Sequence, residues 1–257
     1  MLNYYFEVVA FIFGLCVGSF LNVCIYRLPV SKSIVHPRSM CPVCGNFIRF
    51  YDNIPVLSYA WLKGKCRHCR TAIPLRYPMV EVLSALFALA ITMKYGPTLE
   101  AFIYYAFIAS LLVVTFIDID HRIIPDVITL PGIPIFFAAG FALPGITWKD
   151  SLIGILAGGG SLLLVAYGYS LIMKKEGMGG GDIKLLAMMG AVIGWKGVLF
   201  TIFVASLIGT FAGLLIMVCT RKSMKLAVPF GPFLAIGSIT HIFLGPQLIE
   251  WYFNLLR

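Results

Sequence analysis

Long apolar segments recur throughout the sequence, and they limit the possible folds more than any other feature. A helix needs about 20 apolar residues to cross a bilayer, and runs near that length follow one another along the chain. Charged residues make up only 12% of the 257 residues, whereas about a quarter is usual in soluble proteins. The runs are apolar on every face, which excludes a membrane β-barrel. The sequence therefore predicts an all-α polytopic membrane protein.

Eight of these runs are predicted to be transmembrane helices. They cover residues 5–26, 79–95, 101–117, 127–143, 152–173, 183–193, 198–219 and 230–249. The run 183–193 is short, because its 11 residues rise only about 16 Å as a helix against about 30 Å of hydrocarbon. It is either a re-entrant segment or a crossing in a thinned membrane or a water-filled cleft. No Lys or Arg precedes Arg27, so the first run lacks the basic start of a cleaved signal peptide and is expected to stay in the membrane.

The distribution of basic residues predicts the orientation in the membrane. The segment 27–76 carries nine of the 20 Lys and Arg residues and a single acid, Asp52. Because Lys and Arg accumulate on the cytoplasmic side, this segment is expected inside and the N-terminus outside. Eight crossings place 16 of the 20 basic residues inside, whereas re-entry of the short run would move the basic cluster at 221–225 outside. We therefore favour eight crossings.

Four cysteines of the same loop form two closely spaced pairs. The pairs are Cys41-Pro-Val-Cys44 and Cys66-Arg-His-Cys69, with 21 residues between them. Two such pairs are typical of a zinc ribbon, in which four thiolates hold one tetrahedral ion. An iron or redox site and two disulfides are the alternatives, although disulfides would need an oxidising compartment. Metal binding would supply much of the folding free energy of so short a loop.

Two acids stand where apolar helices meet the cytoplasm. Asp118 directly follows an apolar run, and Asp182 ends the glycine-rich stretch 177–182. An ionisable residue at this depth is costly and indicates function. If the two carboxyl groups met, one would keep a proton while the other acted as a base, which is what direct activation of water requires. Each could instead be a solvated or N-capping residue, since spacing alone does not show that they meet.

The motifs together resemble the bacterial prepilin peptidase family, also called type IV leader peptidases. Gly179-Gly180-Gly181-Asp182 fits the Gly-x-Gly-Asp motif of intramembrane aspartyl proteases. The end of the first helix, the paired-cysteine loop, the Asp118 segment and eight helices follow in the order of the family, over essentially the full chain. The resemblance implies three parts: a first helix at 1–26, a zinc-ribbon-like domain at 27–77 and a seven-helix protease domain at 78–257.

The resemblance further implies a bifunctional enzyme of the bacterial inner membrane. Such enzymes cut the basic leader from type IV prepilins and type II secretion pseudopilins at the cytoplasmic face, after a Gly and usually before a Phe. They then methylate the new amino group with S-adenosylmethionine. These substrates and membrane lipids are the expected partners, and nucleic acid is not. A cation-coupled transporter that uses the same two acids, and a membrane-anchored zinc-ribbon adaptor, are the alternatives to this function.

Residue roles follow from the same resemblance. Asp118 and Asp182 match the catalytic aspartates of the family, with Asp120 as the alternative to Asp118. The glycines before Asp182 are expected to give an extended substrate backbone room and to bind it. We expect three further sets of residues to bind the substrate, the methyl donor and structural zinc. They are Gly179, Gly180 and Gly181 for the substrate, Asn22, Gly64 and Glu81 for the methyl donor, and Cys41, Cys44, Cys66 and Cys69 for zinc.

Overall fold

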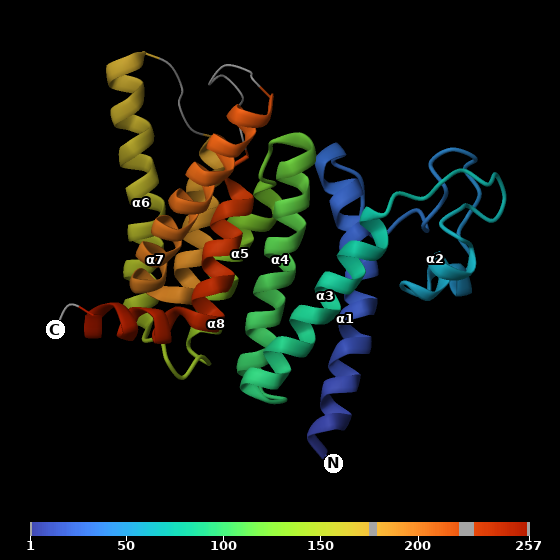
Figure 1. Cartoon of the computed structure of the whole chain (residues 1–257), viewed down its shortest axis with the longest axis horizontal. Helices are drawn as coiled ribbons and strands as arrows, with labels where there is room; N and C mark the ends of the chain where they lie inside the picture. The colour runs from blue at the N-terminus through green and yellow to red at the C-terminus, as the bar shows by residue number, and fades with distance from the viewer. Residues whose placement is uncertain (1, 175–178, 221–228, 256–257) are drawn as a thin grey trace. The chain divides into compact units, whose positions relative to one another are not determined.

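The computed structural model describes residues 2–174, 179–220 and 229–255 (Figure 1). The described residues form helices, with only isolated β-bridges between short loop segments. Four basic residues used above for the orientation, Lys175, Arg221, Lys222 and Lys225, lie outside the described residues. The chain divides into two compact units, residues 1–113 and 114–257.

The first unit is a pair of close-packed helices that carries the cysteine loop. Helix α1 (Leu2–Arg27) packs on α3 (Arg76–Tyr95). A Cβ at Gly18 would lie 2.6 Å from the Cα of Glu81, so only glycine allows this approach. Gly14 meets α3 in the same way, so the two glycines serve helix packing. The loop contains the 3₁₀ turns η1 (Leu28–Val30) and η2 (Phe50–Asn53) and the short helix α2 (Leu57–Trp61).

Helix α4 (Leu99–His121) begins in the first unit and ends in the second, where α5 to α8 complete the fold. The bounds are α5 Asp126–Gly140, α6 Trp148–Met173, α7 Gly180–Thr220 and α8 Gly231–Leu255. Helix α7 is broken at Gly194, whose φ of 64° and ψ of 179° are not helical. The short run expected at 183–193 is therefore the first arm of a longer helix that contains one break.

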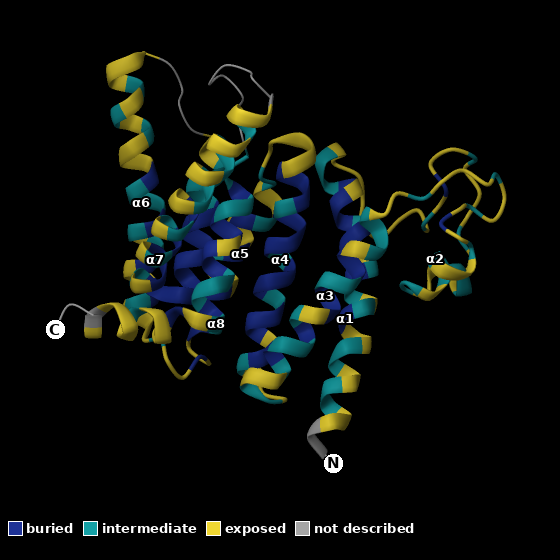
Figure 2. Ribbon diagram, viewed as in Figure 1, coloured by how far each residue is buried: buried dark blue, intermediate teal, exposed yellow. Residues whose placement is uncertain are grey.

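The first arm of α7 is the core of the second unit. Leu185, Leu186, Met188 and Met189 are fully buried. Gly154 and Gly158 on α6 face the backbone of this arm, so close that an added side chain would collide with it. In contrast, the later part of α6 exposes many large apolar side chains, such as Leu164 and Ile172 (Figure 2). An apolar outer surface around a packed interior is what a bilayer requires.

The predicted fold class is confirmed for the described residues. Each of the eight predicted segments is helical, and six helices are long and apolar enough to cross a membrane. One of the six is the broken α7, which contains two of the predicted segments, and α5 is a shorter apolar helix of 15 residues. The number of eight crossings stays a prediction, because it depends on whether α5 and the first arm of α7 each span the membrane.

Candidate aspartate pair and metal site

Asp118 lies in the last turn of α4, with its carboxylate turned into the second unit. The residue is 5% exposed, whereas Asp120 two positions later is exposed. Its Oδ2 accepts a hydrogen bond of 3.0 Å from the backbone N–H of Gly231. Because Gly231 opens α8, the carboxylate faces the positive end of a helix dipole. The two candidates for the first aspartate therefore differ in burial, and only Asp118 faces the interior of the unit.

Asp182 lies in the first turn of α7 and is half-buried. Its carboxylate is close enough to that of Asp118 for the two negative charges to interact. The structure thus brings together two acids from distant parts of the sequence, each beside the N-terminus of a helix. Such helix ends favour negative charge, which offsets part of the cost of placing two carboxylates in an apolar region.

The three glycines before Asp182 have different surroundings. Among the described residues, a Cβ at Gly180 would meet nothing, and one at Gly179 would meet only the carboxylate of Asp182, at 4.0 Å. A Cβ at Gly181 would lie 2.8 Å from the Cβ of Ile124. The described residues thus leave Gly179 and Gly180 uncrowded, whereas Ile124 fills the space beside Gly181.

Sequence reasoning missed Gly231. A Cβ there would lie 2.7 Å from Oδ2 of Asp118, so the close approach of α8 to the carboxylate requires glycine. The signal in the sequence is the stretch Pro229-Phe-Gly-Pro232, which marks a turn before a helix but does not say what the helix end faces.

An ion pair lies one turn from the aspartates. Lys184 Nζ is 2.8 Å from each carboxylate oxygen of Asp126, the first residue of α5. Asp126 therefore connects α5 to the first arm of α7. Lys184 therefore directs its charge to Asp126.

The four loop cysteines converge on one point. Their sulfur atoms all lie within 4.8 Å of one another, and the Sγ atoms of Cys41 and Cys69 are 3.8 Å apart. A tetrahedral zinc ion with Zn–S bonds of about 2.3 Å holds its sulfurs about 3.8 Å apart. The donor set and the separation both fit a four-thiolate metal site.

Local hydrogen bonds prepare the thiols for a metal. In each pair the backbone turns back on itself, since Gly45 N–H donates to Cys41 O and Arg70 N–H to Cys66 O. Hydrogen bonds with the side chain and backbone of Thr71 lower the pKa of Cys69 to about 6. A thiol with this pKa is largely ionised at neutral pH, as metal binding requires.

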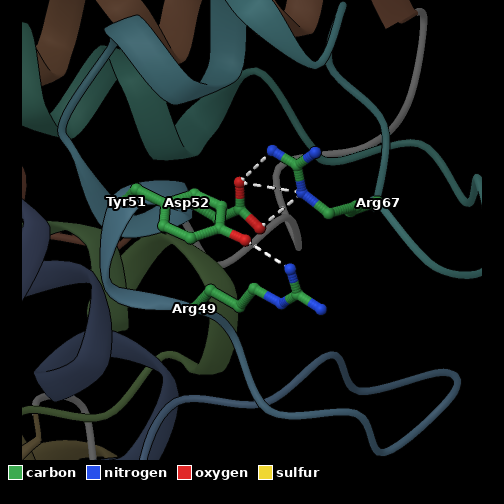
Figure 3. A network of polar contacts seen from close by, with 4 residues as sticks. All are labelled: Arg49, Tyr51, Asp52 and Arg67. Carbon is green, nitrogen blue, oxygen red and sulfur yellow. Dashed lines mark hydrogen bonds and ion pairs between the residues drawn. The ribbon is translucent and has the colours of Figure 1, made fainter.

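A polar network supports the loop beside the metal site (Figure 3). Arg67, inside the second cysteine pair, forms a bidentate ion pair with Asp52, with contacts of 2.6 to 3.1 Å. The guanidinium groups of Arg67 and Arg49 both lie over the ring of Tyr51. The hydrogen bonds and charge of Arg67 lower the pKa of Asp52. Arg67 thus joins the second cysteine pair to η2.

A cavity of about 390 Å³ lies between the loop and the helix ends of the first unit. Asn22 and Glu81, two of the three candidates for methyl-donor binding, line it. Asn22 donates to Tyr77 O, and Glu81 accepts hydrogen bonds from Val56 N–H and Ser19. The third candidate, Gly64, is not among the residues that line the cavity. Its φ of +66° and the hydroxyl of Tyr59, 2.8 Å from an added Cβ, explain why glycine is needed there.

The sequence matches two family profiles. Residues 12–95 match the bacterial peptidase A24 N-terminal domain, and residues 105–214 match the type IV leader peptidase family. Three curated relatives share the name prepilin leader peptidase/N-methyltransferase. They come from Pseudomonas putida (35% identity; 98% of this chain, 95% of the relative), Aeromonas hydrophila (36%; 96% and 93%) and Myxococcus xanthus (39%; 85% and 65%). No solved structure matches the chain.

Proposed function

Since the chain belongs to the type IV leader peptidase family, we propose that it removes the leader from prepilins by direct attack of water, activated by Asp118 and Asp182. The chain is an enzyme of this family, with peptidase and N-methyltransferase activities. Type IV prepilins and type II secretion pseudopilins are the proposed substrates. The proposed scissile bond follows a Gly and precedes a Phe, at the cytoplasmic face of the inner membrane.

The observation that carries this proposal is the proximity of the two carboxylates. The acids belong to helices α4 and α7, yet their negative charges are near enough to interact in an apolar region. Unpaired carboxylates at such a depth are costly and persist where they serve a function. Two adjacent carboxyl groups that share a proton are the arrangement by which aspartic proteases activate water.

The hydrogen bond to Asp118 suggests how the roles divide. Its Oδ2 accepts the N–H of Gly231, and an accepted hydrogen bond stabilises negative charge. We therefore assign Asp118 as the base that takes a proton from water. Asp182 then gives a proton to the leaving amide nitrogen, so the peptide C–N bond breaks with no covalent intermediate. Gly179 and Gly180, which no described residue crowds, are assigned to the substrate backbone, and Gly181, whose side is filled by Ile124, is assigned to the same surface through its backbone alone.

Methyl transfer is assigned to the first unit. The cavity lined by Asn22 and Glu81 has the volume and the mixed polar and apolar lining of a small-molecule site. We propose that S-adenosylmethionine binds there, with Gly64 shaping the wall through Tyr59. When bound, this molecule supplies the methyl group. The chain's own contribution is to bind it and to position the new amino group of the substrate.

Zinc is the proposed occupant of the four-cysteine site, as a structural ion. Four thiolates complete a tetrahedral coordination sphere, so no position is left for a substrate or water. The cysteine loop at 27–77 is proposed as a cytoplasmic zinc-ribbon-like domain, with the first helix at 1–26 and the protease helices at 78–257. The basic excess of this loop supports the cytoplasmic orientation and contact with anionic lipid headgroups.

Intact mass spectrometry of a purified prepilin tests the proposed function. The prepilin is incubated in detergent with the chain, with and without S-adenosylmethionine, beside Asp118→Asn and Asp182→Asn. Loss of the leader is expected with the native chain alone, and a methyl group appears on the product only with the donor. Asp120→Asn, altered in an exposed carboxylate of the same segment, is expected to cleave normally. Cleavage by folded Asp182→Asn at the native rate would refute the aspartate pair.

A further inference from the structure

Ile124 fills the space between two helix ends near the aspartates. It lies in the short segment between α4 and α5 and is half-buried. A Cβ added at Gly181 would be 2.8 Å from the Cβ of Ile124, and one added at Gly231 would be 3.5 Å from its Cδ1. Neither glycine has a positive φ. Both positions therefore need glycine for space and not for backbone conformation.

We propose that Ile124 is a positioning residue that sets the separation between the carboxylates of Asp118 and Asp182. The inference rests on the proposed aspartate pair. Gly181 immediately precedes Asp182, and Gly231 donates its N–H to Asp118. A side chain held between these two glycines thus determines how closely the two helix ends approach. Isoleucine suits such a spacer, because its β-branch leaves few rotamers.

The backbone around Ile124 is held on both sides. Arg122 has a φ of 55°, and its N–H donates to Asp118 O, so that α4 ends one turn after the aspartate. Pro125 then fixes the entry into α5, and the ion pair of Asp126 with Lys184 connects α5 to the first arm of α7. Ile124 is therefore a fixed spacer on a short, constrained segment. Close-packed interiors transmit even a small change in volume to their neighbours.

The two glycines differ in what an added methyl group would strike. At Gly181 the nearest atoms belong to Ile124, so the collision can be relieved by shortening that side chain. At Gly231 the nearest atom is Oδ2 of Asp118, at 2.7 Å, so shortening Ile124 leaves the collision in place. This difference distinguishes a spacer from general loosening of the fold.

The test compares prepilin cleavage by Gly181→Ala, Ile124→Gly and the double variant. Gly181→Ala is expected to lower kcat by about 10- to 100-fold, because a displacement of about 1 Å at a catalytic group has effects of this size. The double variant is expected to recover at least about tenfold of that loss, since the colliding side chain is gone. Gly168→Ala on α6 is the matched control, because a Cβ there meets none of the described residues and the activity is expected to be unchanged.

Gly231→Ala, alone and with Ile124→Gly, completes the test. It is expected to lose most kcat and to gain nothing from Ile124→Gly. Equal recovery of Gly181→Ala and Gly231→Ala by Ile124→Gly would overturn the proposal, as would a native kcat for Gly181→Ala or no recovery in its double variant. If Gly181→Ala raised only KM, Gly181 would act on the substrate alone, which also overturns the proposal.

Two milder variants decide the matter where an alanine variant does not fold in detergent. Ile124→Val keeps the branch at Cβ and is expected to retain most of the kcat, whereas Ile124→Leu moves the branch outward and is expected to lower it several-fold. Equal kcat values for the two would overturn the spacer. Native activity of Asp118→Asn and Asp182→Asn would instead remove the proposed function itself, so the two failures are distinguishable.

Discussion

The two compact units hold their functional residues in different ways. In the first unit the metal site is built from short turns, and each cysteine pair is fixed by hydrogen bonds within a few residues. In the second unit the aspartate pair is built by contacts between segments far apart in the sequence, namely the ends of α4, α7 and α8. The metal site can be predicted from the sequence because its turns are local. The aspartate pair depends instead on how distant helix ends pack.

Exchange of either aspartate for asparagine should have the largest effect on cleavage and should leave methyl transfer by the first unit intact. Asp182→Asn is expected to lower cleavage by more than about a thousandfold, because the pair loses its proton donor. The same variant should still methylate a pilin from which the leader has already been removed, because the methyl-donor cavity lies in the first unit. Methyl incorporation into mature pilin measures this. Loss of both activities in a folded variant would contradict the assignment of cleavage to the second unit and of methyl transfer to the first.

Removal of the metal should have the next largest effect, on the other unit. Cys66→Ser, or treatment with a strong chelator, is expected to release the metal and to reduce methyl transfer to near background, because the loop loses its main source of folding free energy. Cleavage should fall less. Metal content by mass spectrometry is measured beside both activities, with Cys219→Ser on α7 as the control cysteine. A fully folded loop without metal would contradict this account.

Acid should weaken the metal site of the first unit. The pKa of Cys69 is lowered to about 6, so its thiolate is present at neutral pH and is lost as the pH falls through that value. Metal affinity is therefore expected to decline as the pH falls, most steeply below about pH 6, because protons compete with the ion. Titration with a chromophoric zinc chelator measures this. Thr71→Val should shift the decline to higher pH, and an unchanged curve would argue against the role of Thr71.

Changes to the ion pair near the aspartates should have a moderate effect. Lys184→Met is expected to lower cleavage by about two- to threefold, since the pair with Asp126 is partly exposed. Exchanging the two charges, with Lys184→Asp and Asp126→Lys together, should restore part of the loss. Rates that did not respond to either change would show that α5 needs no charge to hold its position.

Asp52→Asn should have the smallest effect. The carboxylate of Asp52 has a lowered pKa in the folded chain, so its pair with Arg67 contributes stability above the unfolded pKa and loses it as the pH falls through the folded value. We expect a decrease of a few degrees at most in the melting temperature of the loop at neutral pH, and no difference from the native chain in strong acid. A difference that grew toward low pH would contradict this sign.

The sequence predicts much of this structure, for identifiable reasons. The helices follow from the apolar runs, and the cysteine cluster follows from two short motifs whose spacing is itself the geometry. The depth of Asp118 was predictable because the residue directly follows an apolar run. A single residue, Gly194, makes the break between the predicted segments 183–193 and 198–219, because its φ of 64° and ψ of 179° interrupt the helix.

The remaining features depend on contacts that leave no local pattern. Gly231 and Ile124 were not predicted, because their importance lies in what they touch: the carboxylate of Asp118 and the N-terminus of α7. The motif does not show whether Gly181 is needed for substrate binding or for packing within the protein. It resembles a substrate-binding glycine, yet the structure fills the space beside it with Ile124. Gly64 was assigned to the methyl donor, but its own backbone and Tyr59 already account for it.

The central claim is that an aspartate pair directs water onto the peptide bond, and a single turnover in oxygen-18 water tests it most directly. Excess enzyme cleaves a prepilin, and the masses of the leader and of the peptides that contain Asp118 and Asp182 are measured. The account predicts oxygen-18 in the new carboxyl group of the leader and none in either aspartate. Oxygen-18 in an aspartate, with an unlabelled leader, would show a covalent acyl-enzyme and contradict the proposed mechanism.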